Sequence, residues 1–176
     1  GEKPILAKYT YKKLNTDEWT SVENTDLQLK MYYLSHTGKN LSSAALIKNS
    51  ENQYFVYFGD TGADRIEGTE QLAELWKAIA PIIKEKKLKG IAIECSYSNE
   101  QPENQLYGHL TPRLLTEEME NLEKLVGEEG LKGLNLIITH IKPKKNIHQK
   151  VKTELNVLYK KGIKIIFAEQ GKVINL

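Results

Sequence analysis

Three apolar runs that each end in a short polar segment constrain the fold of this chain more than any other feature. The runs are YFVYF, LKGIAI and LNLIIT, and the polar segments after them begin Gly59-Asp60, Glu94-Cys95 and Thr139-His140. Short apolar runs bounded in this way are typical of buried strands. In α/β proteins, site residues gather where such strands end, at one edge of the sheet. The sequence therefore predicts that acidic side chains and histidines meet at one sheet edge.

The spacing of apolar residues predicts a layered α/β fold, because strands dominate the first half and alternate with helices in the second. LQLKMYYL, SSAALIK and QYFVYF are typical of consecutive antiparallel strands. We expect further strands over 88–93, 134–139, 163–168 and 172–176, and helices over 69–83, 111–125 and around 151–158. Thr69 and Thr111 are the expected N-caps, Pro112 suits the first helical position, and Pro81 should kink or break its helix.

Composition describes one ordinary globular domain and excludes several functions. The chain has 176 residues, 40% of them hydrophobic and 27% charged, and a formal net charge of +2. This charge is too small to indicate a nucleic acid or an acidic membrane as partner, and we interpret the lysine clusters at 84–89 and 142–152 as solvated surface. No apolar run approaches the length of a membrane span. We therefore expect neither nucleic acid nor membrane as a partner.

The single cysteine, Cys95, excludes an intramolecular disulfide and a zinc site built from cysteines. Nothing in the sequence around Cys95 supplies a base, so we do not expect it to act as a nucleophile. The chain begins with Gly1 rather than methionine, and its first residues lack the pattern of a signal peptide. We expect something upstream to have been removed, and the location, cytoplasmic or periplasmic, stays open.

Asp60 and His140 are candidate metal ligands, because each follows an apolar strand at the predicted edge. From spacing alone, Asp60 is explained slightly better by a turn, and a histidine at a strand end is more often structural. We interpret Asp64 and Arg65, just downstream, as a local ion pair. Both interpretations of the candidate ligands stay open at this point.

His109 and Glu94 suggest a phosphate-handling pair. His109 lies directly before a predicted helix N-terminus, where its ring and the helix dipole could both meet a phosphate. Glu94 ends a buried strand, and an ionised carboxylate there needs a cation or a histidine beside it. Together they could provide a general acid or an oxyanion stabiliser.

Taken in order, five segments resemble the class II cyclic-nucleotide phosphodiesterases, a branch of the metallo-β-lactamase fold. They are HTGKNLSSAALI, YFVYFGDTGADR, LKGIAIECSYSNEQPENQLYGHLTPRLL, GLNLIITHIKP and IIFAEQGKVINL. The resemblance covers about residues 31–176, is most specific from Glu94 to Thr111, and extends to the ribonuclease Z enzymes, which carry comparable GDT, GHST and TH elements. It implies the C-terminal half of a metallo-β-lactamase-like αββα sandwich, a mixed sheet with flanking helices.

The resemblance also implies roles. Asp60 and His140 would be metal ligands in a site for two divalent ions, with zinc expected. His109, oriented by Glu94, would contact the phosphate and assist the leaving group, and Thr111 and His36 would also contact substrate. The implied reaction is hydrolysis of 3′,5′-cyclic nucleotides, with cAMP expected, to 5′-nucleotides. A ribonuclease Z-like phosphodiesterase and a non-catalytic half-domain that pairs with a partner chain are the alternatives.

One departure from the family pattern is decisive. The hallmark His-x-His-x-Asp-His is absent from this chain, which contains only four histidines. A catalytic zinc needs about three protein ligands, and a site for two metals needs more. We therefore expect residues 27–176 to be the C-terminal half of such an enzyme, residues 1–26 to be a connecting segment, and the chain alone to be inactive. The missing N-terminal half, or self-association, would cover an otherwise exposed sheet.

Overall fold

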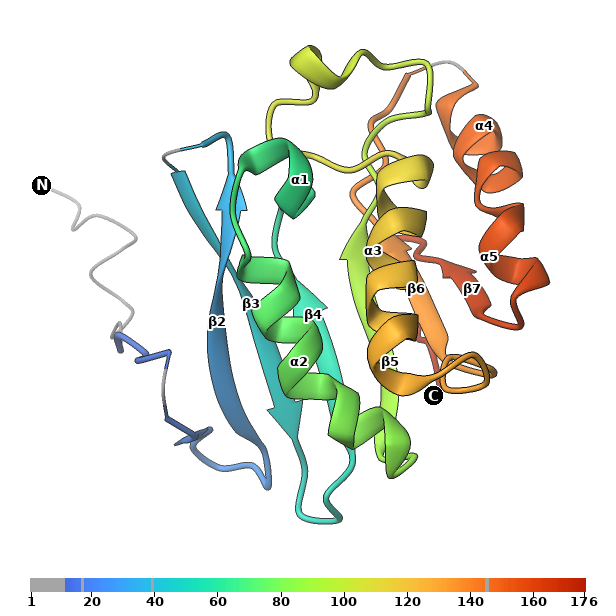
Figure 1. The fold of residues 1–176 in the computed structure, drawn as a ribbon. Helices are drawn as coiled ribbons and strands as arrows, with labels where there is room; N and C mark the ends of the chain where they lie inside the picture. The colour runs from blue at the N-terminus through green and yellow to red at the C-terminus, as the bar shows by residue number, and fades with distance from the viewer. Residues whose placement is uncertain (1–11, 17, 39, 145) are drawn as a thin grey trace, which may run out of the picture.

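The computed structural model describes residues 12–16, 18–38, 40–144 and 146–176, which form a seven-stranded sheet whose neighbours follow chain order (Figure 1). The first four strands are antiparallel and the last four are parallel, so the sheet is mixed, as predicted. The strands are β1 (Thr20–Ser21), β2 (Gln28–His36), β3 (Asn40–Lys48), β4 (Tyr54–Phe58), β5 (Leu88–Glu94), β6 (Asn135–Thr139) and β7 (Lys164–Phe167).

The helices pack on one face of this sheet (Figure 1). Each parallel connection must cross over the sheet, and successive right-handed crossovers in one direction put their helices on the same side. The buried side chains of these helices join those of the central strands in one apolar core. The helices are α1 (Asp64–Glu67), α2 (Gln71–Lys84), the 3₁₀ helix η2 (Glu103–Gln105), α3 (Pro112–Val126), α4 (Ile147–Glu154) and α5 (Asn156–Lys160). Within the described residues, no helix is long and apolar enough to cross a membrane.

The N-terminus of α2 differs from the prediction. Thr69 is not its N-cap, because the carboxylate of Asp64 accepts hydrogen bonds from the backbone N–H groups of Leu72 (3.1 Å) and Ala73 (2.9 Å). The Thr69 hydroxyl instead donates to Asp64 at 2.8 Å. A carboxylate at a helix N-terminus satisfies free N–H groups and complements the helix dipole. Asp64 therefore caps α2 from a separate short helix. Pro81 was expected to kink or break α2, and the helix continues through it without a break.

The expected ion pair between Asp64 and Arg65 is also wrong. Arg65 instead pairs with Glu103 at 2.9 Å and with Glu117 at 3.1 Å. These contacts tie the η2 loop and α3 to α1. By contrast, the predicted N-cap of α3 is confirmed, since the Thr111 hydroxyl accepts from the Leu114 N–H.

The last predicted strand is absent: residues 172–176 carry no strand in the structure. Val173 is 87% exposed. A strand needs a neighbour to bond its backbone groups, and β7 pairs with β6 as the last strand of the sheet. The apolar residues at the C-terminus were therefore insufficient evidence for a strand.

The face of the sheet away from the helices carries a row of apolar side chains across six strands. In register from β2 to β7 this row consists of Met31, Ala45, Tyr57, Ala92, Ile137 and Ile166. Tyr57 is 54% exposed, whereas Ala92 and Ile137 in the middle of the row are each only 4% exposed. Antiparallel sheets that face water usually carry polar residues on that face. We call this row the open face, and its composition is that of a surface that is normally covered.

Candidate active site

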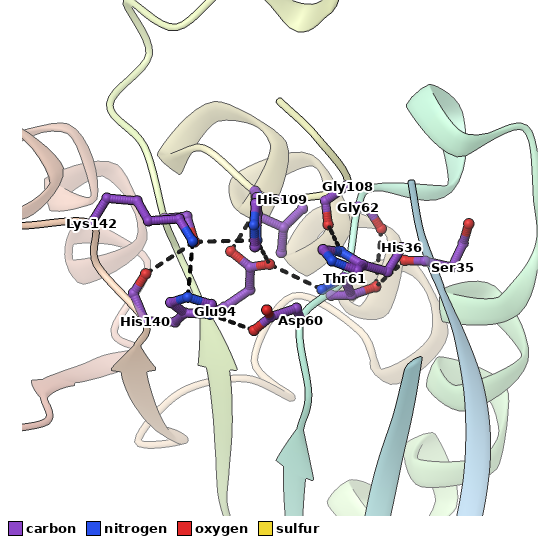
Figure 2. Close-up of polar contacts among 12 residues, drawn as sticks. Ser35, His36, Asp60, Thr61, Gly62, Glu94, Gly108, His109, His140 and Lys142 are labelled. Atoms are coloured by element: carbon purple, nitrogen blue, oxygen red, sulfur yellow. Dashed lines mark hydrogen bonds and ion pairs between the residues drawn. The ribbon is translucent and has the colours of Figure 1, made fainter. Parts of the chain in front are cut away.

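The carboxyl ends of β4, β5 and β6 bring the predicted site residues to one edge of the sheet (Figure 2). Glu94 is the last residue of β5, and His140 directly follows β6. Asp60 lies two residues after β4. Parallel strands end at the same edge, which explains why segments far apart in sequence converge here. His109 reaches this edge from the loop that precedes α3.

Glu94 is a buried carboxylate with several hydrogen-bond donors around it. Only 1% of the residue is exposed. Its Oε1 atom accepts from the His109 ring at 2.7 Å and from the Thr61 backbone N–H at 2.9 Å, and its Oε2 atom accepts from the Leu110 N–H at 3.3 Å. These donors replace the water that an ionised carboxylate loses on burial. Glu94 therefore links the Asp60 loop to the His109 loop.

His109 forms a dyad with Glu94. A carboxylate only accepts, so the Nδ1 atom of His109 is the donor in their 2.7 Å contact, which leaves Nε2 for a ligand in the site. The ring of His109 lies edge-on to those of His36 and His140, with ring centres 5.0 Å and 5.2 Å away. Ser96 connects two of these groups, because its hydroxyl donates to the His140 carbonyl at 3.0 Å and lies 3.3 Å from His109 Nδ1.

Asp60 and His140 contact each other through a carboxylate oxygen and the Nδ1 atom of the ring. Their side chains are 37% and 38% exposed, in contrast to the buried dyad. His140 has a φ of 56°, in the left-handed region that non-glycine residues rarely adopt. This turn directly after β6 directs its ring back toward the loop of β4 (Figure 2).

His36, at the end of β2, is held in place by the loop before His109. Its Nδ1 atom donates to the carbonyl of Gly108 at 2.9 Å. Gly108 has a φ of 74°, and a Cβ atom added there would lie 2.3 Å from the backbone nitrogen of Thr37. Only glycine permits this close approach. The contact leaves Nε2 of His36 for other partners.

The side chains at this edge suit a metal ion. One possible ligand atom from each of His36, Asp60 and His109 lies within 4.8 Å of the other two, and Asp60 also contacts His140. Imidazole nitrogen and carboxylate oxygen are common zinc ligands in proteins. The sequence prediction placed His36 with the substrate, and this role stays a prediction; in the structure the ring also lies close enough to Asp60 and His109 to share a metal ion with them. Its link to Gly108 spans 72 positions of sequence, which no local pattern reveals.

Thr111 and Cys95 lie near this site but face the protein. Thr111 is 1% exposed and its hydroxyl caps α3, so a substrate contact by this residue stays a prediction. Burial, with the carboxylates of Glu94 and Glu154, raises the pKa of the Cys95 thiol well above its ordinary value. A neutral buried thiol is a poor nucleophile, which agrees with the role expected for Cys95.

One charged residue at the site was missed. The ammonium of Lys142 lies 2.9 Å from Nε2 of His140 (Figure 2). The sequence prediction had assigned Lys142 to a solvated lysine cluster. The available signal was its position two residues after a candidate ligand and directly before a proline, in the segment His-Ile-Lys-Pro.

The fold and this site together define an α/β protein with a buried Glu-His dyad beside donors that suit metal-assisted hydrolysis. A family model for cAMP phosphodiesterases class-II matches residues 5–171. The chain belongs to this family, which is metal-dependent.

Curated relatives and a solved structure agree with this assignment. The chain is 41% identical to a 3′,5′-cyclic-nucleotide phosphodiesterase of Aliivibrio fischeri, over 97% of this chain and 53% of that protein. It is 39% identical to a probable 3′,5′-cyclic-nucleotide phosphodiesterase of Yersinia pestis, over 97% of this chain and 51% of that protein. The crystal structure of unliganded yeast PDE1 matches with a TM-score of 0.80 and 29% identity, over 91% of this chain and 48% of that chain. The chain therefore spans about half the length of these relatives.

Proposed function

We propose that this chain supplies the C-terminal half of the active site of a metal-dependent phosphodiesterase that hydrolyses 3′,5′-cyclic nucleotides, cAMP foremost, to 5′-nucleotides. The observation that carries the proposal is the buried dyad of Glu94 and His109, whose free ring nitrogen lies beside the donors of Asp60, His36 and His140. The family to which the chain belongs and the names of its relatives support the substrate class.

The residues of this chain divide into two groups by what they would contact. Asp60, His140 and His36 would help to hold two divalent ions, with zinc expected, which supply Lewis acidity and an activated water when bound. His109 would contact the phosphate. Three such ligands are too few for two metals, and the His-x-His-x-Asp-His element is absent here. Further ligands would come from residues equivalent to the half of the relatives that this chain does not span.

Hydrolysis forms a bond between phosphorus and a water oxygen, breaks the bond from phosphorus to the 3′ oxygen, and delivers a proton to that oxygen. His109 is placed to steady the charge that develops there and to deliver the proton from Nε2. Glu94 fixes the orientation of this ring by accepting a hydrogen bond from Nδ1. It also accepts a hydrogen bond from the Thr61 N–H, which keeps the dyad beside the loop that carries Asp60.

The open face supports the same proposal. The exposed part of the apolar row, at Tyr57 above all, would be covered by the part of the fold that supplies the remaining ligands, or by a second copy of the chain. The metal site and the missing cover would then be completed by the same event. This explains why we expect the chain by itself to be inactive.

The test compares this 176-residue chain with the complete natural protein that contains it. Each is incubated with cAMP in zinc and in EDTA, 5′-AMP is measured by chromatography, and bound metal is measured by mass spectrometry. The complete protein should hydrolyse cAMP only with metal, and the chain alone should not. Turnover by the isolated chain would refute its incompleteness. A metal-loaded complete protein that leaves cAMP intact would refute the function, and cleavage of precursor tRNA instead would favour the ribonuclease alternative.

The role of His109 has its own test. His109→Ala in the complete protein should lower kcat by about 10²-fold or more, as expected for loss of a general acid, with bound metal unchanged. Loss of metal in this variant would make His109 a ligand instead, and unchanged turnover would exclude it from the reaction.

A further inference from the structure

Lys142 is attached to the site at both ends of the residue. Its backbone N–H donates to the carbonyl of Ser96 at 3.1 Å, and its ammonium donates to Nε2 of His140 at 2.9 Å. Pro143 follows, and a residue before proline is restricted to extended backbone. The backbone of Lys142 is therefore fixed, while its four-carbon stem lets the ammonium move along the edge of the sheet.

The charge of Lys142 lacks a carboxylate partner among the residues that the structure describes. Other lysines in the same part of the chain do pair with carboxylates, such as Lys150 with Glu100 at 2.6 Å and Lys161 with Glu123 at 2.8 Å. Lys142 donates instead to a ring nitrogen, and it is only half-buried. A cation at this position, beside the candidate metal ligands, can still bind an anion.

The contact between Lys142 and His140 cannot persist when a metal ion is bound, if the proposed function is correct. A metal on Nε2 would occupy the lone pair to which Lys142 donates. A metal on Nδ1, between the ring and Asp60, would leave the ring hydrogen on Nε2, so two donors would face each other. Repulsion between the ammonium and a divalent cation acts in the same direction. In either arrangement Lys142 must leave His140.

We propose that Lys142 is a substrate-binding residue whose ammonium leaves His140 in the metal-loaded protein and pairs with a non-bridging phosphate oxygen of the cyclic nucleotide. The ring centre of His140 is 5.2 Å from that of His109, so a phosphate that contacts His109 lies within reach of this ammonium. Lysine binds phosphate as a mobile point charge. Negative charge on the phosphoryl oxygens increases as water attacks, so the pair strengthens toward the transition state.

The experiment uses Lys142→Met in the complete natural protein, with Lys142→Arg as the variant that retains the charge and Lys164→Met as the control. Lys164 begins β7 at the opposite end of the parallel strands and is exposed, so its replacement removes the same charge away from the site. The measurements are the Kd of 5′-AMP by calorimetry in zinc, the KM and kcat for cAMP, and the affinity for zinc.

Lys142→Met should weaken 5′-AMP binding and kcat/KM about 10- to 100-fold, the effect of one hydrogen bond to a charged group. Zinc should bind at least as tightly as in the wild type, because a competing cation is gone. Lys142→Arg should recover most of the loss, and Lys164→Met should match the wild type. Weaker zinc binding with unchanged 5′-AMP affinity would show that Lys142 only orients His140, which overturns the proposal. Wild-type protein that binds neither nucleotide would refute the proposed function itself.

Discussion

The loop around Gly108 offers the sharpest test of how the site is held together. Gly108 has a φ of 74°, and an added Cβ would lie 2.3 Å from the Thr37 nitrogen and 2.6 Å from Nδ1 of His36. Gly133 has almost the same φ, 77°, but has nothing within 4 Å of the added atom. Alanine at the two positions therefore shares the backbone strain and differs only in the contact with β2.

The magnitude follows from these two environments. A side chain in the left-handed region destabilises by about 1–2 kcal/mol, and this is all that Gly133→Ala should lose. Gly108→Ala adds overpacking against backbone atoms, about 1–3 kcal/mol. It also separates the His36 ring from the Gly108 carbonyl, which removes a hydrogen bond of about 1 kcal/mol. The second variant should therefore be less stable than the first by about 2–4 kcal/mol.

The assay is urea unfolding of both variants in the complete natural protein, followed by circular dichroism with linear extrapolation to zero urea. Zinc affinity is measured alongside, and only Gly108→Ala should reduce it, because only that change displaces His36. Equal unfolding free energies for the two variants would show that the loop is free to move away from β2. In that case the assignment of His36 as a metal ligand would also be wrong.

Three further predictions address other parts of the structure. Glu94→Gln should lower kcat by about 10²-fold with bound metal retained, and an unchanged kcat would remove the dyad from the mechanism. Burial raises the pKa of the Glu118 carboxyl. Between the ordinary pKa of glutamate and this raised pKa, the native state keeps a proton that the unfolded state has released. The free energy of unfolding should therefore fall as pH rises through this window. Unfolding of Glu118→Gln followed against pH should lack this decline, and an identical profile would contradict it. Tyr57→Lys should destabilise the complete protein by about 2 kcal/mol or more in urea unfolding. The reason is that the open face would be covered in the complete protein, so the new charge would be buried there. Tyr159→Lys, at a position 65% exposed on α5, should change stability by only about 0.5 kcal/mol, and equal effects would mean that the open face stays in water.

Sequence periodicity was sufficient for the architecture, because each apolar run long enough to be buried had a neighbour to pair with. It failed where the partner was distant or missing. Thr69 has the composition of an N-cap, yet Asp64 caps α2 from another helix. The apolar residues at 172–176 have no neighbouring strand. Local rules cannot detect either condition, since both depend on contacts between separate elements.

The candidate site divides in the same way. Asp60, Glu94 and His140 could be placed together from sequence, because all three lie at or just after the ends of parallel strands. His36 ends an antiparallel strand and reaches the site only through Gly108, so only resemblance to a family singled it out. Lys142 was obscured by the lysines around it, because charge runs alone do not show which member turns toward a site.

The two groups of site residues differ in how complete they are within this chain, and this predicts the order in which the site forms. Glu94 and His109 are 1% and 6% exposed, and every hydrogen bond that orients the ring comes from this chain. Asp60 and His140 remain more than a third exposed, and among the described residues their side chains hydrogen-bond only with one another and with Lys142. The phosphate-handling group can therefore fold before the metal ligands are completed. Metal affinity should then depend on assembly with the remainder of the site, because ligand binding and folding are coupled wherever a site is only partly preformed.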